Sequence, residues 1–284
     1  MTIIEPHIHM TSRTTDDYQR MYASGVRACV EPAFWLGQPR RHAGSFLDYF
    51  DWILDFETER ARRFGIEHYA TIAVNPKEAE DLDLAEAVLA ELPRYLDHPR
   101  CVGVGETGLN LITENEARVF RRHLDLAMER NMLILIHSPH DKPDLGVSKA
   151  EGVRRIVAVL RDLDYDLNRV IIDHNTEATI AISRDLPVWT GLTVYPYSKL
   201  DPKRAAAIAR QYGLERMLVN SSADWGVSDP CSLARVADHM RAEGLTGEDI
   251  TKLLFDNPLA FWSQCDRFRP DLDLTPVPVE EFQR

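Results

Sequence analysis

The chain has 284 residues, of which 44% are hydrophobic and 27% charged, and its formal net charge is −12. This composition is that of an ordinary globular protein with enough residues to bury a large core. The negative charge gives no global support to non-specific binding of nucleic acid or an anionic membrane, although a local basic groove stays open. No apolar run reaches the roughly 18 residues that a membrane-spanning helix needs, so we expect none.

The four cysteines are far apart and form no C-x-x-C pair. Cys29 and Cys101 lie in apolar runs, where a free thiol behaves as a small hydrophobic side chain. Histidine and charged residues interrupt the N-terminus before a long apolar core develops, which argues against a signal peptide. We therefore expect a reducing, cytoplasmic location.

Short apolar runs alternate along the chain with longer amphipathic segments. The apolar runs predict strands at 2–8, 26–30, 68–74, 101–104, 132–136, 169–172, 188–194 and 217–219. Apolar residues at helical spacing predict helices over 45–64, 83–96, 114–130, 149–163, 203–212, 229–243 and 247–254. Between the first two strands we expect at best a short helix over 16–23.

This alternation predicts parallel strands, because each helical crossover returns the chain to the same end of the sheet. Eight nearly continuous apolar strands favour a single-domain α/β protein with the (β/α)₈ TIM-barrel fold. An open, doubly wound sheet is the alternative. We expect the barrel to span residues 1–265, and residues 266–284, rich in proline and charge, to form a short irregular C-terminal tail.

Polar residues stand at the ends of five of these strands. In a barrel the carboxyl ends surround one mouth, where barrel enzymes hold their active sites. The residues that would meet there are His7, His9, Glu106, His137, His174 and Asp224. Such a set can hold one or two divalent ions. His7, His9 and Asp224 would hold one, His137 and His174 the other, and Glu106 would bridge both.

Imidazole and carboxylate donors without thiolates fit a catalytic metal rather than a closed structural one. We expect zinc, with manganese, iron or magnesium as alternatives. A divalent metal lowers the pKa of bound water toward about 7, and Asp224 has the position of a general base. Any one of these histidines alone would be a core or surface group. Six converging residues without a cation would be costly to bury.

Two other motifs fit their usual functions poorly. Residues 103–108 match G-x-G-x-x-G, but Glu106 would face a bound pyrophosphate and no helix begins directly after Gly108. Ser221 and Ser222 lack the G-x-S-x-G setting of a serine nucleophile.

At these residues the sequence resembles the TatD-like metal-dependent hydrolases of the amidohydrolase superfamily, over roughly residues 1–262. The matching motifs are His7-Ile8-His9, the run from Gly103 to Leu109, Ile136-His137-Ser138, Asp173-His174, Asp224 and the run from Asn257 to Phe261. The resemblance implies a (β/α)₈ barrel with a mono- or dinuclear divalent centre, often zinc. Its ligands would correspond to His7, His9, Glu106, His137, His174 and Asp224.

The sequence departs from the nuclease-like members of that family around the centre. Asn110 stands where they commonly have aspartate, and Asn175 follows His174 where they commonly have cysteine. Asp224 lies in Ser-Ala-Asp-Trp rather than Glu-Thr-Asp. These departures argue against cleavage of DNA.

The loop after the second strand offers aromatic rings and two arginines that could hold a small ring with an anionic group. An ordinary structural loop explains the same residues equally well. Candidate substrate contacts, including residues after the fifth, seventh and eighth strands, are Phe34, Trp35, Arg40, Arg41, His140, Tyr195, Tyr197 and Trp225.

Together these observations predict a metal-dependent hydrolase acting on a small or medium-sized ester, amide or phosphoester. A TatD-type metal-dependent deoxyribonuclease is a second hypothesis. A non-catalytic, metal-stabilised barrel that serves as a pathway scaffold is a third. Association into a homo-oligomer stays open.

Overall fold

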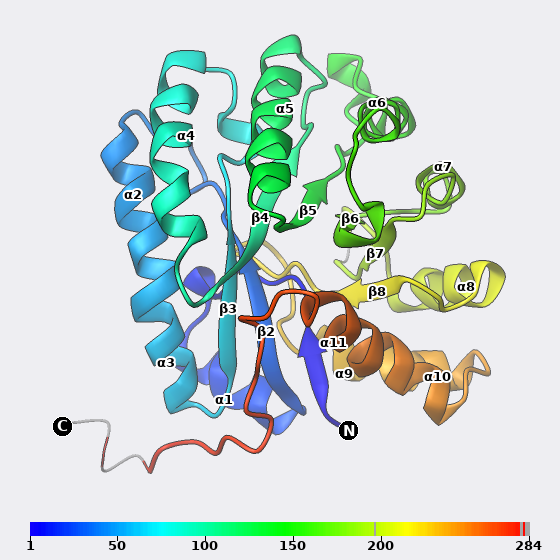
Figure 1. The fold of residues 1–284 in the computed structure, drawn as a ribbon. Coiled ribbons are helices and arrows are strands. Elements are labelled where there is room, and N and C mark those ends of the chain that lie inside the picture. The colour runs from blue at the N-terminus through cyan, green and yellow to red at the C-terminus, as the bar shows by residue number, and fades with distance from the viewer. Residues whose placement is uncertain (196, 279–280, 282–284) are drawn as a thin grey trace.

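The computed structural model describes residues 1–195, 197–278 and 281. Eight parallel strands form one sheet in sequence order (Figure 1). They are β1 (Ile3–Glu5), β2 (Val26–Pro32), β3 (Glu67–Ile72), β4 (Cys101–Gly108), β5 (Leu133–His137), β6 (Val170–Ile172), β7 (Trp189–Thr193) and β8 (Met217–Asn220). The sheet curls into a nearly closed barrel, which confirms the predicted (β/α)₈ architecture.

Backbone hydrogen bonds between the segments that follow β1 and β8 bring the two edges of the sheet together. The N–H of His9 donates to the carbonyl of Ala223 at 3.0 Å, and the N–H of Ser222 donates to the carbonyl of His7 at 2.8 Å. Below them, the buried carboxyl of Glu5 accepts from the N–H of Ser221 at 3.2 Å. The segment that carries the two histidines therefore also joins β1 to β8.

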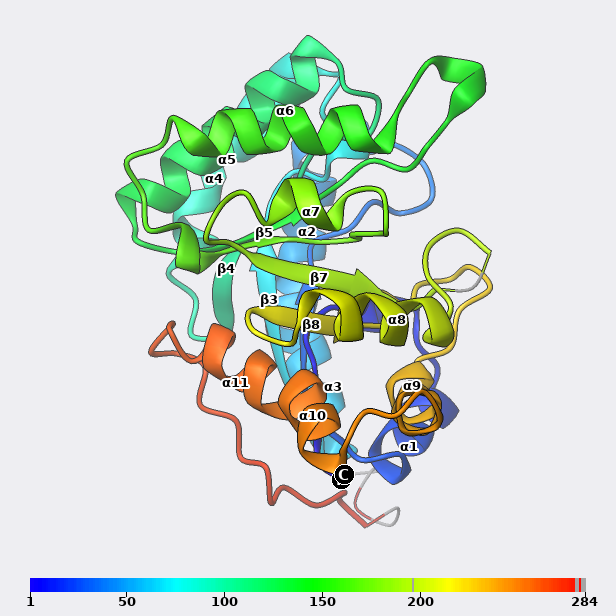
Figure 2. The same cartoon turned by 90° about the vertical axis from the view of Figure 1, so that its right-hand side faces the viewer.

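Helices surround the sheet on its outer side (Figures 1 and 2). They are α1 (Thr15–Ala23), α2 (Ala43–Asp51), α3 (Glu57–Arg63), α4 (Leu82–Leu96), α5 (Glu114–Glu129), α6 (Lys149–Arg161), α7 (Ile180–Ser183), α8 (Pro202–Tyr212), α9 (Ser232–Ala242), α10 (Gly247–Thr251) and α11 (Asn257–Trp262). In α5, Val119, Phe120 and Leu124 recur at helical spacing and are buried in the core. Within the described part of the chain, no helix is sufficiently long and apolar to span a membrane.

Several elements differ from the sequence-based expectation. The first strand ends at Glu5, so His7 and His9 lie in the loop beyond it. α1 is a full helix of nine residues, and the N–H of Thr14 donates to Asp17 as in a capping box. α2 and α3 are joined by a π-helical turn (Trp52–Phe56). The G-x-G-x-x-G run lies inside β4 and is therefore not a phosphate-binding loop.

One end of the barrel is filled by residues from the end of the chain. The inward-facing side chains of Ile4, Val102 and Leu135 share one hydrophobic cluster with Trp262 and Phe268. Figure 1 shows α11 and the segment after it crossing this end of the sheet. Residues just beyond the expected boundary at 265 thus contribute to the core. The boundary itself stays a prediction, and residues 279–280 and 282–284 of the expected tail lie outside the described residues.

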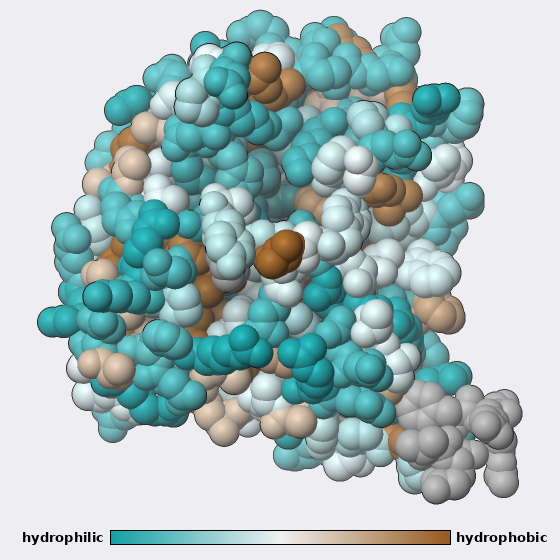
Figure 3. All heavy atoms as spheres, turned by 180° about the vertical axis from the view of Figure 1, so that it is seen from behind, coloured by the Kyte–Doolittle hydropathy of each residue, from teal (hydrophilic) through white to brown (hydrophobic). Residues whose placement is uncertain are grey.

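The opposite end of the barrel is open. In Figure 2, β7 points toward the side that faces away from the viewer of Figure 1. Figure 3, seen from behind, therefore looks onto the carboxyl ends of the strands, and this face is hollowed near its centre. The polar residues at the strand ends meet at this mouth.

The substitution Phe268→Ala tests the hydrophobic packing that fills the closed end of the barrel. Phe268 is fully buried, so we expect the substitution to lower the free energy of unfolding by about 3–5 kcal/mol, because it removes a large apolar side chain and leaves a cavity. Denaturant unfolding measures the change. Phe56→Ala is the matched control, since Phe56 is 51% exposed and its ring contacts mainly that of Trp52, so its loss should cost about 1 kcal/mol. An equal loss of unfolding free energy in the two variants would contradict the role of Phe268 in filling the closed end of the barrel.

Candidate metal centre

His7 and His9 present ring nitrogens to one another at the mouth of the barrel. Nδ1 of His7 lies 2.5 Å from Oδ2 of Asp173. Nε2 of His7 lies 3.2 Å from Nε2 of His9 and 3.7 Å from Oε1 of Glu106. A carboxylate at Nδ1 holds the imidazole proton there and leaves the Nε2 lone pair free, as in the carboxylate–histidine–metal arrangement. The free nitrogen of His7 thus faces His9 and Glu106.

Glu106, at the end region of β4, is shared by the other two histidines. Its Oε1 lies 3.0 Å from Nδ1 of His137 and 3.0 Å from Nε2 of His174. Its Oε2 accepts a hydrogen bond from Nδ2 of Asn75 at 3.0 Å. Burial opposes ionisation of this carboxyl, but the neighbouring imidazoles, His137 foremost, hold its pKa well below the usual range. The group at the middle of the cluster is therefore a carboxylate.

Asp173 is the second buried carboxylate of the cluster. It accepts from Nδ2 of Asn220 at 2.9 Å and from the N–H of His174 at 2.6 Å. Burial raises its pKa, but the neighbouring imidazoles and these hydrogen bonds outweigh that effect and leave the pKa below its ordinary value. A Cβ on Gly191 of β7 would lie 2.0 Å from Oδ1 of Asp173. The glycine therefore makes room for the carboxylate.

The backbone at His174 is also unusual. Its φ is +60°, in the left-handed region that a non-glycine residue seldom adopts. Nδ1 of the ring lies 2.6 Å from Oγ1 of Thr193, which leaves Nε2 directed at Glu106. Such conformations persist where surrounding contacts fix them, and they gather at functional sites.

The donor atoms fit a divalent metal. Among the described residues, three sets of potential ligand atoms each lie within 4.8 Å of one another, and two of these sets, His7–His9–Glu106 and Glu106–His137–His174, share Glu106. Zinc bonds of about 2.0–2.1 Å in tetrahedral geometry place ligands about 3.3 Å apart, near the separations found here. Nδ1 of His9 and Nε2 of His137 are buried without a hydrogen-bond partner within the described chain.

The protonation states of these imidazoles also suit coordination. Burial lowers the pKa of His9 well below its ordinary value, and burial likewise lowers the pKa of His137. Neutral imidazole is the form that binds a metal. The residues present at the mouth therefore match what a divalent ion requires.

Asp224 lies at the mouth but apart from these sets. Its Oδ1 accepts from the hydroxyl of Tyr195 at 2.8 Å and from the N–H of Gly226 at 2.7 Å. The sequence analysis grouped Asp224 with His7 and His9, whereas in the structure Asp173 is the aspartate in contact with His7. The signal for Asp173 was its position directly before His174 at a strand end.

A pocket of about 150 Å³ opens above the cluster, and Phe34, which lines it, stacks on the ring of His9 at 3.8 Å. Pockets for drug-sized ligands measure about 300–1,000 Å³, so this one suits a small molecule or one end of a larger one. It is lined by Phe34, Lys77, Glu106, His137, His140, His174, Tyr195, Ser198, Lys199, Ser222 and Asp224.

The structure does not bring every expected substrate contact into this pocket. Arg40 is buried in an ion pair with Glu78, and it also donates to the carbonyl of Phe34 at 3.0 Å. Arg41 is exposed, and neither arginine lines the pocket. Arg40 therefore braces the loop that carries Phe34.

The other expected substrate contacts lie at different distances from the pocket. His140 lines the pocket, with its ring 6.0 Å from that of His174. Trp225 lies beside the pocket, with its ring 5.1 Å from that of Phe34 and 6.3 Å from that of Trp35. Tyr197 is 95% exposed.

The sequence analysis missed the cations of the pocket, Lys77 and Lys199. Burial lowers the pKa of Lys199 to about 8, so this lysine is mainly protonated at neutral pH. Burial also lowers the pKa of Lys77. The signal that could have found them is that both lysines follow barrel strands, in the loops after β3 and β7.

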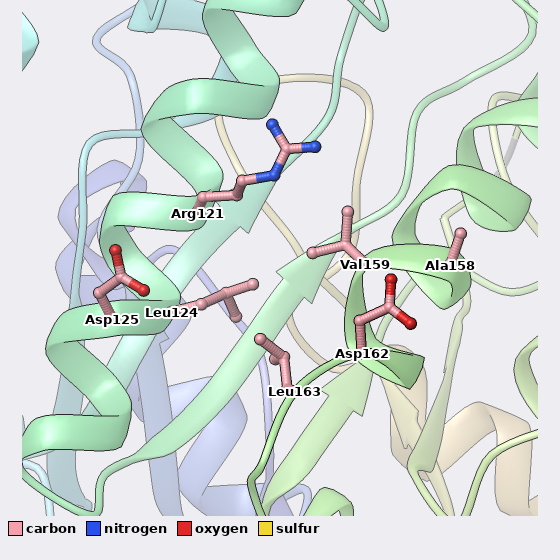
Figure 4. Close-up of a pocket in the computed structure, with 7 residues that line it drawn as sticks. All are labelled: Arg121, Leu124, Asp125, Ala158, Val159, Asp162 and Leu163. Carbon is pink, nitrogen blue, oxygen red and sulfur yellow. The ribbon is translucent and has the colours of Figure 1, made fainter.

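A larger pocket, of about 380 Å³, lies on the outer side of the barrel between α5 and α6 (Figure 4). It is lined by Arg121, Leu124, Asp125, Ala158, Val159, Asp162 and Leu163. These residues include no histidine or cysteine, and the pocket lies away from the carboxyl ends of the strands. The candidate metal-binding residues therefore lie at the mouth of the barrel and not at this outer pocket.

Comparison with known proteins identifies the family of this chain. The family model described as TatD related DNase matches residues 4–263. An uncharacterized metal-dependent hydrolase of Methanocaldococcus jannaschii is 30% identical over 264 residues, which cover 92% of this chain and 99% of that protein.

Solved structures share the fold. The crystal structure of a TatD-like protein from Archaeoglobus fulgidus has a TM-score of 0.74 at 22% identity and covers 92% of this chain and 99% of that one. A beta-aspartyl dipeptidase from Fervidobacterium islandicum has a TM-score of 0.64 at 14% identity, covering 91% of this chain and 72% of that one. From the match of its family model and the similarity of its curated relative, the chain belongs to the TatD family of metal-dependent hydrolases.

Proposed function

We propose that this hydrolase cleaves a small or medium-sized ester, amide or phosphoester at the mouth of the barrel. The observation that carries the proposal is the position of Glu106. One of its oxygens is within 3.0 Å of both His137 and His174, and the pair His7 and His9 lies beside it under a small pocket. This arrangement combines a cation-binding cluster with room for a substrate.

The proposed ligands are His7, His9, Glu106, His137 and His174, with Asp173 orienting His7. We propose zinc as the metal, because imidazole and carboxylate donors at these separations suit it. When bound, a divalent metal supplies Lewis acidity and lowers the pKa of coordinated water. The carboxylate of Asp173 would hold His7 in the tautomer that coordinates through Nε2.

Asp224 is the proposed general base. It lines the pocket, and the hydroxyl of Tyr195 and the N–H of Gly226 fix its Oδ1. These two hydrogen bonds leave Oδ2 free of partners within the described chain, so this oxygen can accept a proton from water in the pocket. Phe34 covers His9 and limits the access of bulk water to that side of the cluster. The proton taken up by Asp224 would then pass to the leaving group.

Deoxyribonuclease activity is a second candidate, and the observation that favours it is the description of the matching family model, TatD related DNase. Incubation of the metal-loaded protein with single- and double-stranded DNA separates the two functions. Cleavage that disappears in the His7→Asn variant would support the nuclease. Turnover confined to a screen of esters, lactones, amides and phosphoesters would support the small-molecule hydrolase.

Three further points stay proposals. We propose a cytoplasmic location. The scaffold hypothesis would require a metal without an open coordination position, whereas a pocket lies directly above the proposed ligands. Self-association into a homo-oligomer stays a prediction.

The substitution Asp224→Asn tests the proposed base. It keeps the size of the side chain but removes its basicity, so we expect turnover to fall by about 10²–10⁴-fold while the metal content stays unchanged. Steady-state kinetics on a substrate found by the hydrolytic screen, together with elemental analysis, measure both quantities. Asp238→Asn is the control, because the Asp238 side chain is 79% exposed on α9. Normal turnover in Asp224→Asn would exclude this role.

The substitution Asp173→Asn tests the support of His7. An uncharged amide no longer stabilises the Nδ1 proton as a carboxylate does, so we expect metal affinity to weaken by about 10–100-fold. Competition with a chromogenic chelator measures this affinity without a substrate. Asp185→Asn, at a side chain 67% exposed, serves as the control. Equal affinities in the two variants would show that Asp173 does not support the centre.

A further inference from the structure

Lys77 lies at the pocket, and its ammonium group has no hydrogen-bond acceptor or carboxylate partner among the described residues. It stands in the 3₁₀ turn Pro76–Glu78 after β3 and is half-buried. Its Nζ lies 4.3 Å from the centre of the Trp35 ring and 5.5 Å from that of Phe34. Within the described chain, no carboxylate lies within 4.0 Å of this nitrogen and no acceptor binds it. The aromatic rings fix the cation on one side and leave its N–H groups available on the other.

Lys199 approaches the same pocket from the loop after β7. Its Nζ donates to Oγ of Ser222 at 2.9 Å and lies 5.1 Å from the centre of the Tyr195 ring. Among the residues that the structure describes, it too has no carboxylate within 4.0 Å. A single neutral hydroxyl therefore accepts from this ammonium group, which has three N–H donors.

Each lysine is connected to a proposed metal ligand through one intervening residue. Asn75 donates to Glu106 with its Nδ2 and accepts the backbone N–H of Lys77 with its Oδ1. Ser222 accepts from Lys199 and donates its backbone N–H to the carbonyl of His7. The backbone of Lys77 and the ammonium group of Lys199 are thus linked to the centre from different sides of the barrel.

Other cations near the mouth have partners. Nζ of Lys142 donates to Oδ1 of Asn110 at 2.7 Å. Nζ of Lys149 donates to the carbonyl of Pro139 at 3.0 Å and to Oγ of Ser138 at 3.2 Å. Arg40 is paired with Glu78. Because charged groups are costly to desolvate unless partners compensate them, Lys77, with no acceptor in the described chain, and Lys199, with one, are the least compensated of these cations.

The balance of charges in the pocket also favours an anionic ligand. The carboxylates at or beside it are Glu106, Asp173 and Asp224, and the first two face imidazoles. Even a single divalent ion together with Lys77 and Lys199 outweighs these three negative charges. An oxyanion that enters this pocket would offset the excess positive charge and could accept hydrogen bonds from both lysines.

We infer that Lys77 and Lys199 form an oxyanion-binding site beside the metal centre, which selects substrates that carry a carboxylate or phosphate group. This inference rests on the proposed function, because it concerns the same pocket. It narrows the substrate class to small anionic molecules. The two lysines would bind the anionic group and hold the scissile bond over the centre, and both act as specificity determinants.

Calorimetric titration with two simple probes, inorganic phosphate and benzoate, tests the site without any turnover. Each probe is titrated into the metal-loaded protein and into the protein freed of metal by a chelator. We expect at least one probe to bind the metal-loaded wild-type protein, and to bind the metal-free protein more weakly, because there the two lysines alone face three carboxylates. Lys77→Met and Lys199→Met should each weaken that binding by at least tenfold, and Lys77→Arg, which keeps the positive charge, should bind within about threefold of wild type.

Lys142→Met is the matched control, because it removes a half-buried lysine that already has Asn110 as its partner. It should bind the probes as the wild-type protein does. A preference for phosphate or for benzoate identifies the oxyanion that the pocket favours. Failure of both probes to bind the wild-type protein, or equal binding by the methionine variants and wild type, would overturn the inference.

Elemental analysis of the same samples separates this inference from the proposed function. Normal metal content with binding indifferent to the lysines would overturn the anion site and leave the hydrolase proposal intact. Lysine-dependent binding of a probe by a wild-type protein that takes up no divalent metal would support the anion site and overturn the metal-based proposal.

Discussion

The Glu106 carboxylate, buried among imidazoles, is the constraint on which the rest of the site depends. A charge removed from water is stable only if partners replace its hydration. Here His137 and His174 approach one oxygen and Asn75 binds the other. Those partners come from three different positions around the barrel, so the centre exists only when the strands that carry them are in register. Folding and the assembly of the site are therefore the same event at this end of the molecule.

The way in which the barrel closes reinforces this coupling. The backbone of His7 and His9 bonds to the segment after β8, so the residues proposed to bind metal also join the first strand to the last. Asp173 then ties the side chain of His7 to the end of β6. At the opposite end, Trp262 and Phe268 fill the barrel interior with apolar side chains. The sheet thus has one end sealed by hydrophobic packing and the other organised by polar contacts.

The sequence predicted the barrel and brought attention to four histidines and Glu106, because period and position at strand ends report backbone geometry directly. The sequence analysis placed Asp224 beside His7 and His9, whereas in the structure Asp173 contacts His7. Which of Asp173 and Asp224 contacts His7 depends on the left-handed turn at His174 and on the space left by Gly191, neither of which has a periodic signal. Arg40 was expected at the substrate, but Glu78 lies close enough to pair with it. Loop contacts of this kind depend on tertiary structure.

The difference between the strand ends and the loops explains how such a centre can serve a particular substrate. The proposed ligands stand at or just beyond strand ends, where the hydrogen bonding of the barrel positions their backbone. The pocket residues proposed to face the substrate, Phe34, Lys77, Lys199 and Asp224, stand in loops after β2, β3, β7 and β8. A loop can exchange one charge for another without moving a strand. We therefore expect the specificity of this chain to depend on the charge of its loops. Among the lysines described at the mouth, Lys77 and Lys199 have the fewest hydrogen-bond acceptors, so their charge is the least compensated by the described chain.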